Sequence, residues 1–174
     1  MAEALALSLP DDIDRLAQEV LREACDRGLL LATAESCTGG LLASLLTDIP
    51  GKSHAFERGF VTYTDEAKHE LLGVSLEILK SDGAVSESAA RAMAEGAIGH
   101  SHADVAVSIT GFTEDAPGEP GGLVHFACAR RHGGPTRHHV QRFAPPGRAE
   151  VRLAALRTAL ILLRDALADL ERAA

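Results

Sequence analysis

The stretch Leu29-Leu30-Leu31-Ala32-Thr33-Ala34-Glu35-Ser36-Cys37-Thr38-Gly39-Gly40-Leu41-Leu42-Ala43-Ser44-Leu45-Leu46 decides the fold. Two apolar runs flank a short polar segment that ends in two glycines, which is the order of a buried strand, a sharp turn and a helix. We predict a strand over residues 29–34 and a helix from about Thr38 to Leu46. Backbone N–H groups at such a helix start point outward and suit an anion or a developing oxyanion. Small nucleophilic side chains, Ser36 and Cys37, therefore lie next to a candidate anion site.

Helical and extended patterns alternate along the rest of the chain. A first amphipathic helix is opened by Asp11 or Asp12 and closed by Gly28, and the hydroxyls of Thr64 and Ser86 predict two later helix starts. Helices and strands interleave early and a hairpin comes late, so we predict a three-layer α/β/α sandwich with a mixed sheet of about five strands. The other predicted elements are a strand within 56–64, a short helix ending at Gly73, a helical turn over 75–79, a helix over 87–98, strands over 104–110, 122–130 and 137–143, and a last helix beginning at 145–147.

Length and composition narrow the class of protein. The 174 residues are enough to bury a core and fit one domain over residues 1–174, and the formal net charge of −8 disfavours long-range attraction to nucleic acid. The 3 cysteines are an odd number without C-x-x-C spacing, which favours reduced thiols. No apolar run approaches ~20 residues, and the N-terminus lacks the basic segment of a signal peptide. We therefore expect a cytoplasmic protein without a membrane span, with apolar residues on the first and last helices that favour a homo-oligomer.

Ser36 has two interpretations. As a helix cap its hydroxyl would stabilise the helix by about 1 kcal/mol, whereas as a nucleophile it needs a base. No G-x-S-x-G elbow or histidine pattern indicates a Ser–His–Asp triad. Tyr63 and Lys68 offer another base, because with Thr64 as N-cap they occupy the two positions that meet in a hydrophobic staple, at the end of a strand. A desolvated lysine can lose its proton or lower the pKa of a neighbouring phenol; the alternative is that Tyr63 only packs on the lysine stem.

Other residues carry weaker signals. Cys37 is a rival nucleophile or, alternatively, a buried core cysteine. Thr110-Gly111 ends an apolar strand and either lines the same cleft or is an ordinary connection. Arg148, at the start of the last helix, is a candidate phosphate donor or a solvated side chain. His132 and His138-His139 lack metal-ligand spacing and fit a solvated hairpin.

Several ordered blocks of this sequence together resemble the CinA C-terminal domain family, the nicotinamide-nucleotide amidohydrolases. The likeness covers most of the chain, from about residue 12 to residue 170. It implies an α/β/α sandwich that hydrolyses the carboxamide of nicotinamide mononucleotide (NMN), giving nicotinic acid mononucleotide and ammonia, with no metal or other cofactor. The blocks are Thr33-Ala34-Glu35-Ser36-Cys37-Thr38-Gly39-Gly40, Gly59-Phe60-Val61-Thr62-Tyr63-Thr64-Asp65-Glu66-Ala67-Lys68, Leu72-Gly73-Val74, Gly83-Ala84-Val85-Ser86-Glu87 and Ser108-Ile109-Thr110-Gly111.

The resemblance also implies roles for individual residues. It makes Ser36 the nucleophile, and Tyr63 with Lys68 the pair that activates it. Backbone N–H groups after Ser36 would bind the oxyanion, and residues at two further chain segments would bind the substrate. The residues expected to contact the substrate are Cys37, Thr38, Gly39, Gly40, Thr110, Gly111 and Arg148.

One segment departs from the family's pattern. The family has a loop of the type Ile-Ala-Gly-Pro-x-Gly-Gly after Thr-Gly, whereas residues 112–122 read Phe-Thr-Glu-Asp-Ala-Pro-Gly-Glu-Pro-Gly-Gly, with three carboxylates. Acidic side chains near an anionic nucleotide would repel its phosphate. The sequence therefore leaves two hypotheses: an NMN amidohydrolase of pyridine nucleotide salvage, or a catalytically impaired relative that binds a nucleotide or scaffolds a partner.

Overall fold

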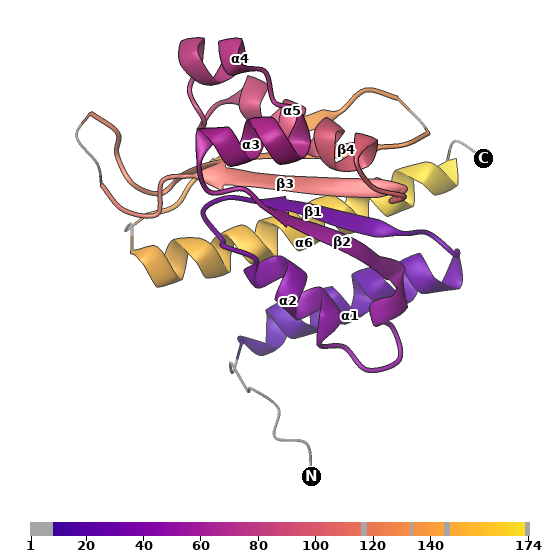
Figure 1. Cartoon of the computed structure of the whole chain (residues 1–174). Helices are drawn as coiled ribbons and strands as arrows, with labels where there is room; N and C mark the ends of the chain where they lie inside the picture. Colours follow the sequence, from indigo (N-terminus) through magenta and orange to yellow (C-terminus); the bar gives the residue numbers. More distant parts are fainter. Residues whose placement is uncertain (1–8, 116–117, 133, 145–146, 173–174) are drawn as a thin grey trace.

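A mixed five-stranded sheet lies at the centre of the molecule (Figure 1). The computed structural model describes residues 9–115, 118–132, 134–144 and 147–172. The strand order is β2-β1-β3-β4-β5; β2, β1 and β3 are parallel, and β4 and β5 are antiparallel to their neighbours. The predicted mixed sheet of about five strands is confirmed. The strands are β1 (Leu31–Glu35), β2 (Phe56–Val61), β3 (Val105–Gly111), β4 (Leu123–Arg130) and β5 (Arg137–Arg142).

Helices cover both faces of the sheet and complete the predicted three layers (Figure 1). One face packs on α1 (Asp11–Asp26), α2 (Leu41–Thr47) and α6 (Arg148–Arg172). The other face packs on α3 (Asp65–Leu72), α4 (Leu76–Ser81) and α5 (Glu87–Gly99). A short 3-10 helix, η1 (Ser53–Ala55), precedes β2. Because the core holds mostly Leu, Ala, Val and Ile, the helices pack closely on the sheet.

Alternation along β1 sends neighbouring side chains to opposite layers. Ala32 and Ala34 belong to the core under α3, α4 and α5, while Thr33 and Glu35 face α2. Ser36 follows Glu35 and faces the α3 side, where it meets Lys68. The carboxyl ends of β1, β2 and β3 all lie at one edge of the sheet, which is where ligands bind in open α/β folds.

Two details of the sequence prediction need correction. The second helix begins at Leu41 rather than near Thr38, because Gly39 and Gly40 adopt positive φ angles of 62° and 89° that end the turn before the helix starts. The apolar residues of the first and last helices pack against each other and the sheet. Large exposed apolar side chains in the described parts of the chain lie elsewhere, at Val61, Tyr63, Leu71, Leu76 and Val140. Self-association stays a prediction, but the apolar residues of the first and last helices no longer support it.

Helix starts with hydroxyl caps agree with the prediction. The Thr64 and Ser86 side chains accept hydrogen bonds from the N–H groups of Ala67 and Ala89. The predicted start of the last helix at 145–147 lies partly outside the described residues, and α6 is described from Arg148. No described helix has the length and apolar character needed to cross a membrane.

Candidate active site

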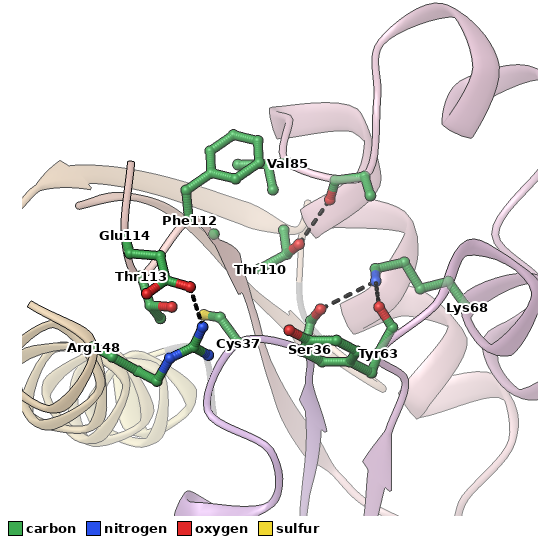
Figure 2. A pocket seen from close by; sticks show the side chains of 12 residues that line it. Ser36, Cys37, Tyr63, Lys68, Val85, Thr110, Phe112, Thr113, Glu114 and Arg148 are labelled. Carbon is green, nitrogen blue, oxygen red and sulfur yellow. Dashed lines mark hydrogen bonds and ion pairs between the residues drawn. The ribbon is translucent and has the colours of Figure 1, made fainter. Parts of the chain in front are cut away.

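The Lys68 amine and the Ser36 hydroxyl are in direct contact at the carboxyl edge of the sheet (Figure 2). Lys68 Nζ donates to Ser36 Oγ at 3.1 Å, to the Thr62 carbonyl at 2.9 Å and to the Tyr63 carbonyl at 3.4 Å. Lys68 is only 1% exposed. The two residues that the sequence proposed as nucleophile and base therefore meet, although 32 positions separate them in the chain.

Burial lowers the pKa of the Lys68 amine, while the Asp65 carboxylate and Cys37 oppose that shift. Two backbone carbonyls and one hydroxyl surround the amine, and neither kind of group supplies a full compensating charge. Because its pKa is lowered, a larger fraction of the amine is neutral near neutral pH. A neutral amine at this distance can accept the hydroxyl proton of Ser36.

Helix α3 positions the amine. Thr64 caps its first turn, and Gly73 ends it with a left-handed φ of 68°. The end of α3 lies very close to α5. A Cβ added at Gly96 of α5 would lie 2.0 Å from the carbonyl oxygen of Leu72, the last residue of α3. This close approach requires glycine at position 96, and it seats α3, the helix that carries Lys68, directly against α5.

A buried carboxylate holds the turn that presents Ser36. Glu35 is fully buried and accepts hydrogen bonds from the Thr38 hydroxyl at 2.7 Å and from the N–H groups of Leu42 and Ala43 at 3.0 and 2.8 Å. Glu35 thus binds the second and third N–H groups of α2, and the first, that of Leu41, donates to the Thr38 carbonyl. Gly40 occupies the N-cap position and has no side chain, so the Glu35 carboxylate does the capping. The interpretation of Ser36 as the helix cap is therefore wrong, and the start of α2 is not a free anion site.

Thr38, Gly39 and Gly40 shape this turn and do not line the pocket. The Thr38 hydroxyl is bound to Glu35, its carbonyl accepts from Arg152 Nη2 at 2.6 Å, and the Gly39 N–H donates to the Ser36 carbonyl at 3.1 Å. These contacts belong to the structure of the turn, and the expected contact of the three residues with substrate stays a prediction.

Tyr63 contacts Lys68 through its backbone carbonyl, and its ring extends past Ser36 toward Arg148 (Figure 2). Tyr63 is 68% exposed and lines the mouth of the pocket. Arg148 pairs with Glu114, and after that carboxylate the Tyr63 phenol is the next group that raises the pKa of the guanidinium. The structure thus brings Tyr63 to the site but places its phenol on the Arg148 side of Ser36.

A pocket of about 330 Å³ opens beside Ser36 and Lys68. Thr110 lines it, but its hydroxyl donates to the Ala84 carbonyl at 2.7 Å and so can only accept from a ligand. Gly111 also lines it, and the tight pairing of β3 with β4 leaves no room for a side chain there. Of the residues expected at the site, the lining includes Ser36, Cys37, Tyr63, Lys68, Thr110, Gly111 and Arg148.

The sequence prediction missed five lining residues. Ala84 and Val85 lie just before the Ser86 cap of α5, and Phe112, Thr113 and Glu114 follow β3. The sequence analysis places the acidic segment 112–122 near the substrate's phosphate without naming these three as site residues, and the segment after the carboxyl end of a parallel strand borders the ligand site of an open sheet. Ala84 and Val85 come from a connection whose position follows only from tertiary packing.

Cys37, the alternative nucleophile, and the histidines take no part in the contact between Ser36 and Lys68. Burial raises the pKa of the Cys37 thiol to about 12, so it stays protonated and weakly nucleophilic at neutral pH. His138 is half-buried and its Nε2 lies 3.0 Å from His125 Nδ1, which corrects the expectation of a solvated hairpin at this position. Within the described ranges, no group of three or more His, Cys, Asp or Glu residues is placed to hold a metal ion.

Relatives of the chain share its sequence over long stretches. Nicotinamide-nucleotide amidohydrolase PncC of Escherichia coli strain K12 is 46% identical over 125 residues, which cover 70% of this chain and 76% of that protein. A CinA-like protein of Akkermansia muciniphila is 46% identical over 154 residues, 87% of this chain and 37% of that one. The chain spans only 30% to 37% of the length of the first curated relatives that it matches.

Solved structures agree with the sequence matches. The crystal structure of competence/damage inducible protein CihA from Agrobacterium tumefaciens has a TM-score of 0.86 and 46% identity, covering 91% of this chain and 97% of that one. A competence-damaged protein (CinA) superfamily protein from Escherichia coli has a TM-score of 0.82 and 39% identity, covering 91% and 94%. The model of the CinA C-terminal domain family matches residues 13–167. Since that match spans most of the chain, the protein belongs to the CinA C-terminal domain family.

Proposed function

We propose that this protein is an amidohydrolase that converts NMN to nicotinic acid mononucleotide and ammonia. The observation that carries the proposal is the 3.1 Å contact between Lys68 Nζ and Ser36 Oγ inside a pocket that also holds a guanidinium at its rim. A named nicotinamide-nucleotide amidohydrolase at 46% identity supports the choice of substrate.

The proposed acylation step uses the two buried groups. Neutral Lys68 takes the proton of Ser36 as Oγ forms a bond to the carboxamide carbon, and the carbonyl oxygen becomes an oxyanion. Backbone N–H groups that follow Ser36 would donate to that oxygen. Lys68 then gives its proton to the amide nitrogen, the C–N bond breaks, and ammonia leaves an ester on Ser36.

The proposed second step returns the enzyme to its starting state. A water molecule gives a proton to Lys68 while its oxygen attacks the ester carbon. The C–O bond to Ser36 then breaks, Lys68 returns the proton to Oγ, and the carboxylic acid product leaves. Tyr63, at the mouth between Ser36 and Arg148, would orient the pyridine or its tail, and Arg148 would bind the phosphate.

The first test is ammonia release from NMN by the purified protein and by Ser36→Ala. We expect the wild type to release ammonia and the variant to lose turnover, with little change in melting temperature because one hydrogen bond is worth about 1 kcal/mol. Ser44→Ala, at an exposed serine on α2, is the matched control and should keep full activity. Full turnover by Ser36→Ala would exclude Ser36 as nucleophile.

The second hypothesis, a relative that binds nucleotide without catalysis, gives a different result. Calorimetry would then show tight NMN binding by the wild type with no ammonia released. The pairing of Arg148 with Glu114, a loop residue that departs from the family pattern, is the observation that favours this outcome.

A further inference from the structure

Glu114 lies at the mouth of the pocket and binds the Arg148 guanidinium, to which the proposed function gives the substrate's phosphate. It follows β3 in the loop 112–122, and its carboxylate forms an ion pair with Arg148 at the start of α6 (Figure 2). Both side chains are more than half exposed, so solvent and a ligand can reach them. The ion pair links the loop after β3 to the start of α6, and both segments line the pocket.

The charges along the pocket lining are few. Among the described residues that line it, the lysine, arginine and carboxylate side chains are Lys68, Arg148 and Glu114, and Lys68 is buried against Ser36. The rim therefore carries one cation and one anion already in contact. A phosphate monoester, which carries a charge of about −1.5 to −2 at pH 7, must compete with Glu114 for the guanidinium and is repelled by the same carboxylate. A substrate whose ribose carries only hydroxyl groups neither competes with Glu114 for the guanidinium nor is repelled by the carboxylate.

We propose that Glu114 is a specificity-determining residue, which sets how strongly the site distinguishes a phosphorylated pyridine carboxamide from the unphosphorylated riboside. The inference rests on the proposed function and assigns it a substrate range. With Glu114 present, the site accepts the riboside nearly as well as the mononucleotide, because the carboxylate offsets the attraction of Arg148 for phosphate. The negative charge at position 114 reduces the difference in kcat/KM between the mononucleotide and the riboside.

The test compares Glu114→Gln with Glu119→Gln. Glu119 lies in the same loop, is exposed and does not line the pocket, so its replacement removes the same charge at a different place. We measure kcat/KM for NMN and for nicotinamide riboside at low and high salt. For Glu114→Gln we expect the NMN-to-riboside ratio to rise roughly two- to tenfold at low salt and less at high salt. The control should keep the wild-type ratio.

Two results would overturn the inference. An unchanged or lower ratio in Glu114→Gln would mean that the carboxylate does not oppose phosphate, or that it holds Arg148 in place for it. An equal rise in Glu119→Gln would mean that the net charge of the loop, and not the contact with Arg148, is responsible.

Binding separates this inference from the proposed function. Dissociation constants of NMN and the riboside are measured by calorimetry in Ser36→Ala, with and without Glu114→Gln. If neither the wild type nor the single variant Glu114→Gln releases ammonia but the binding ratio shifts as expected, the amidohydrolase proposal fails and the role of Glu114 stands. If ammonia is released but neither ratio shifts, only the inference fails. Binding of neither ligand would overturn both.

Discussion

At the scale of single residues, the environment of each group decides whether it can react. Lys68 is buried among neutral oxygen atoms, and this lowers its pKa. Cys37 is next to Ser36 in the chain, but burial raises the pKa of its thiol. The same physical cause therefore makes the amine a better base and the thiol a poorer nucleophile.

The lowered pKa of Lys68 gives a pH dependence of defined sign. The active amine is neutral, so kcat/KM for NMN should rise with pH through a limb that lies below the ordinary lysine value of 10.5. Lys68→Arg should lose activity by about a hundredfold or more, because a guanidinium does not release its proton. The measurement is ammonia release between pH 6 and pH 10 (roughly the range between the ordinary His and Lys pKa values).

Lys80→Arg, at an exposed lysine of α4, is the control for this substitution and should match the wild type. Activity that falls steadily as pH rises, or that survives in Lys68→Arg, would contradict the role of a neutral amine.

The sequence could predict which residues meet here, but not through which atoms. Spacing around the Thr64 cap predicted that Tyr63 and Lys68 are neighbours, and they are, through the Tyr63 carbonyl. The phenol instead interacts with Arg148, which comes from α6 and lies far away in the chain. Glu35 carries no local signal of its capping role, because its partners are the N–H groups of a helix that begins six residues later.

At the scale of elements, local signals predicted helix starts and could not predict strand order. Thr64 and Ser86 cap helices because a hydroxyl and the N–H three residues later are close in any chain. The order β2-β1-β3-β4-β5 depends on pairing between segments far apart in sequence. The close approach of α3 and α5 is also nonlocal, since it depends on Gly96 against Leu72.

Gly96 gives a prediction for the pair of helices. In Gly96→Ala the new Cβ would clash with the Leu72 carbonyl, so α3 must move away, and we expect a loss of about 1–3 kcal/mol in the free energy of unfolding. The movement shifts Lys68 from Ser36, so kcat should fall as well. Urea unfolding and ammonia release measure the two effects.

The matched control is Gly99→Ala, also on α5, where an added Cβ meets nothing within 4 Å. We expect this control to be neutral or slightly stabilising, as alanine has the higher helix propensity. If both variants behaved alike, the contact between α3 and α5 would have no special role.

At the scale of the whole molecule, the two halves of the sheet serve different purposes. The parallel strands β1 and β2 lead to Ser36 and Lys68, while the antiparallel β4 and β5 extend the sheet on the far side of β3. A pair of stacked histidines, His125 on β4 and His138 on β5, lies between this hairpin and Glu87 of α5. Burial is the first cause that lowers the pKa of both histidines, and Glu87 opposes it.

The histidine pair predicts how the stability of the fold depends on pH. Below the ordinary value of 6.5 the unfolded chain takes up protons that the folded pair resists, so the free energy of unfolding should fall as pH drops from about 6.5 toward the lowered values. We expect a loss of up to about 1 kcal/mol, since both rings are partly solvated. Thermal unfolding at pH 7.5 and 5.5 (about one unit on either side of the ordinary His pKa) measures it.

His125→Gln should make this pH dependence shallower, because only one titrating ring remains in the pair. His54→Gln, at an exposed histidine of η1, is the control and should keep the wild-type dependence. A dependence that is as steep in His125→Gln as in the wild type would assign the effect to other groups.

The opposite directions of Glu35 and Ser36 at the end of β1 carry one more consequence. The strand repeats every two residues, so inserting or deleting a single residue in β1 would exchange the layers that these side chains enter. The carboxylate would then meet the amine of Lys68, and the hydroxyl would lie beneath α2, where it has too few acceptor sites for the N–H groups now held by Glu35. The reactive pair and the cap of α2 would be lost together. The function of this strand therefore depends on the register of its residues as much as on their identity.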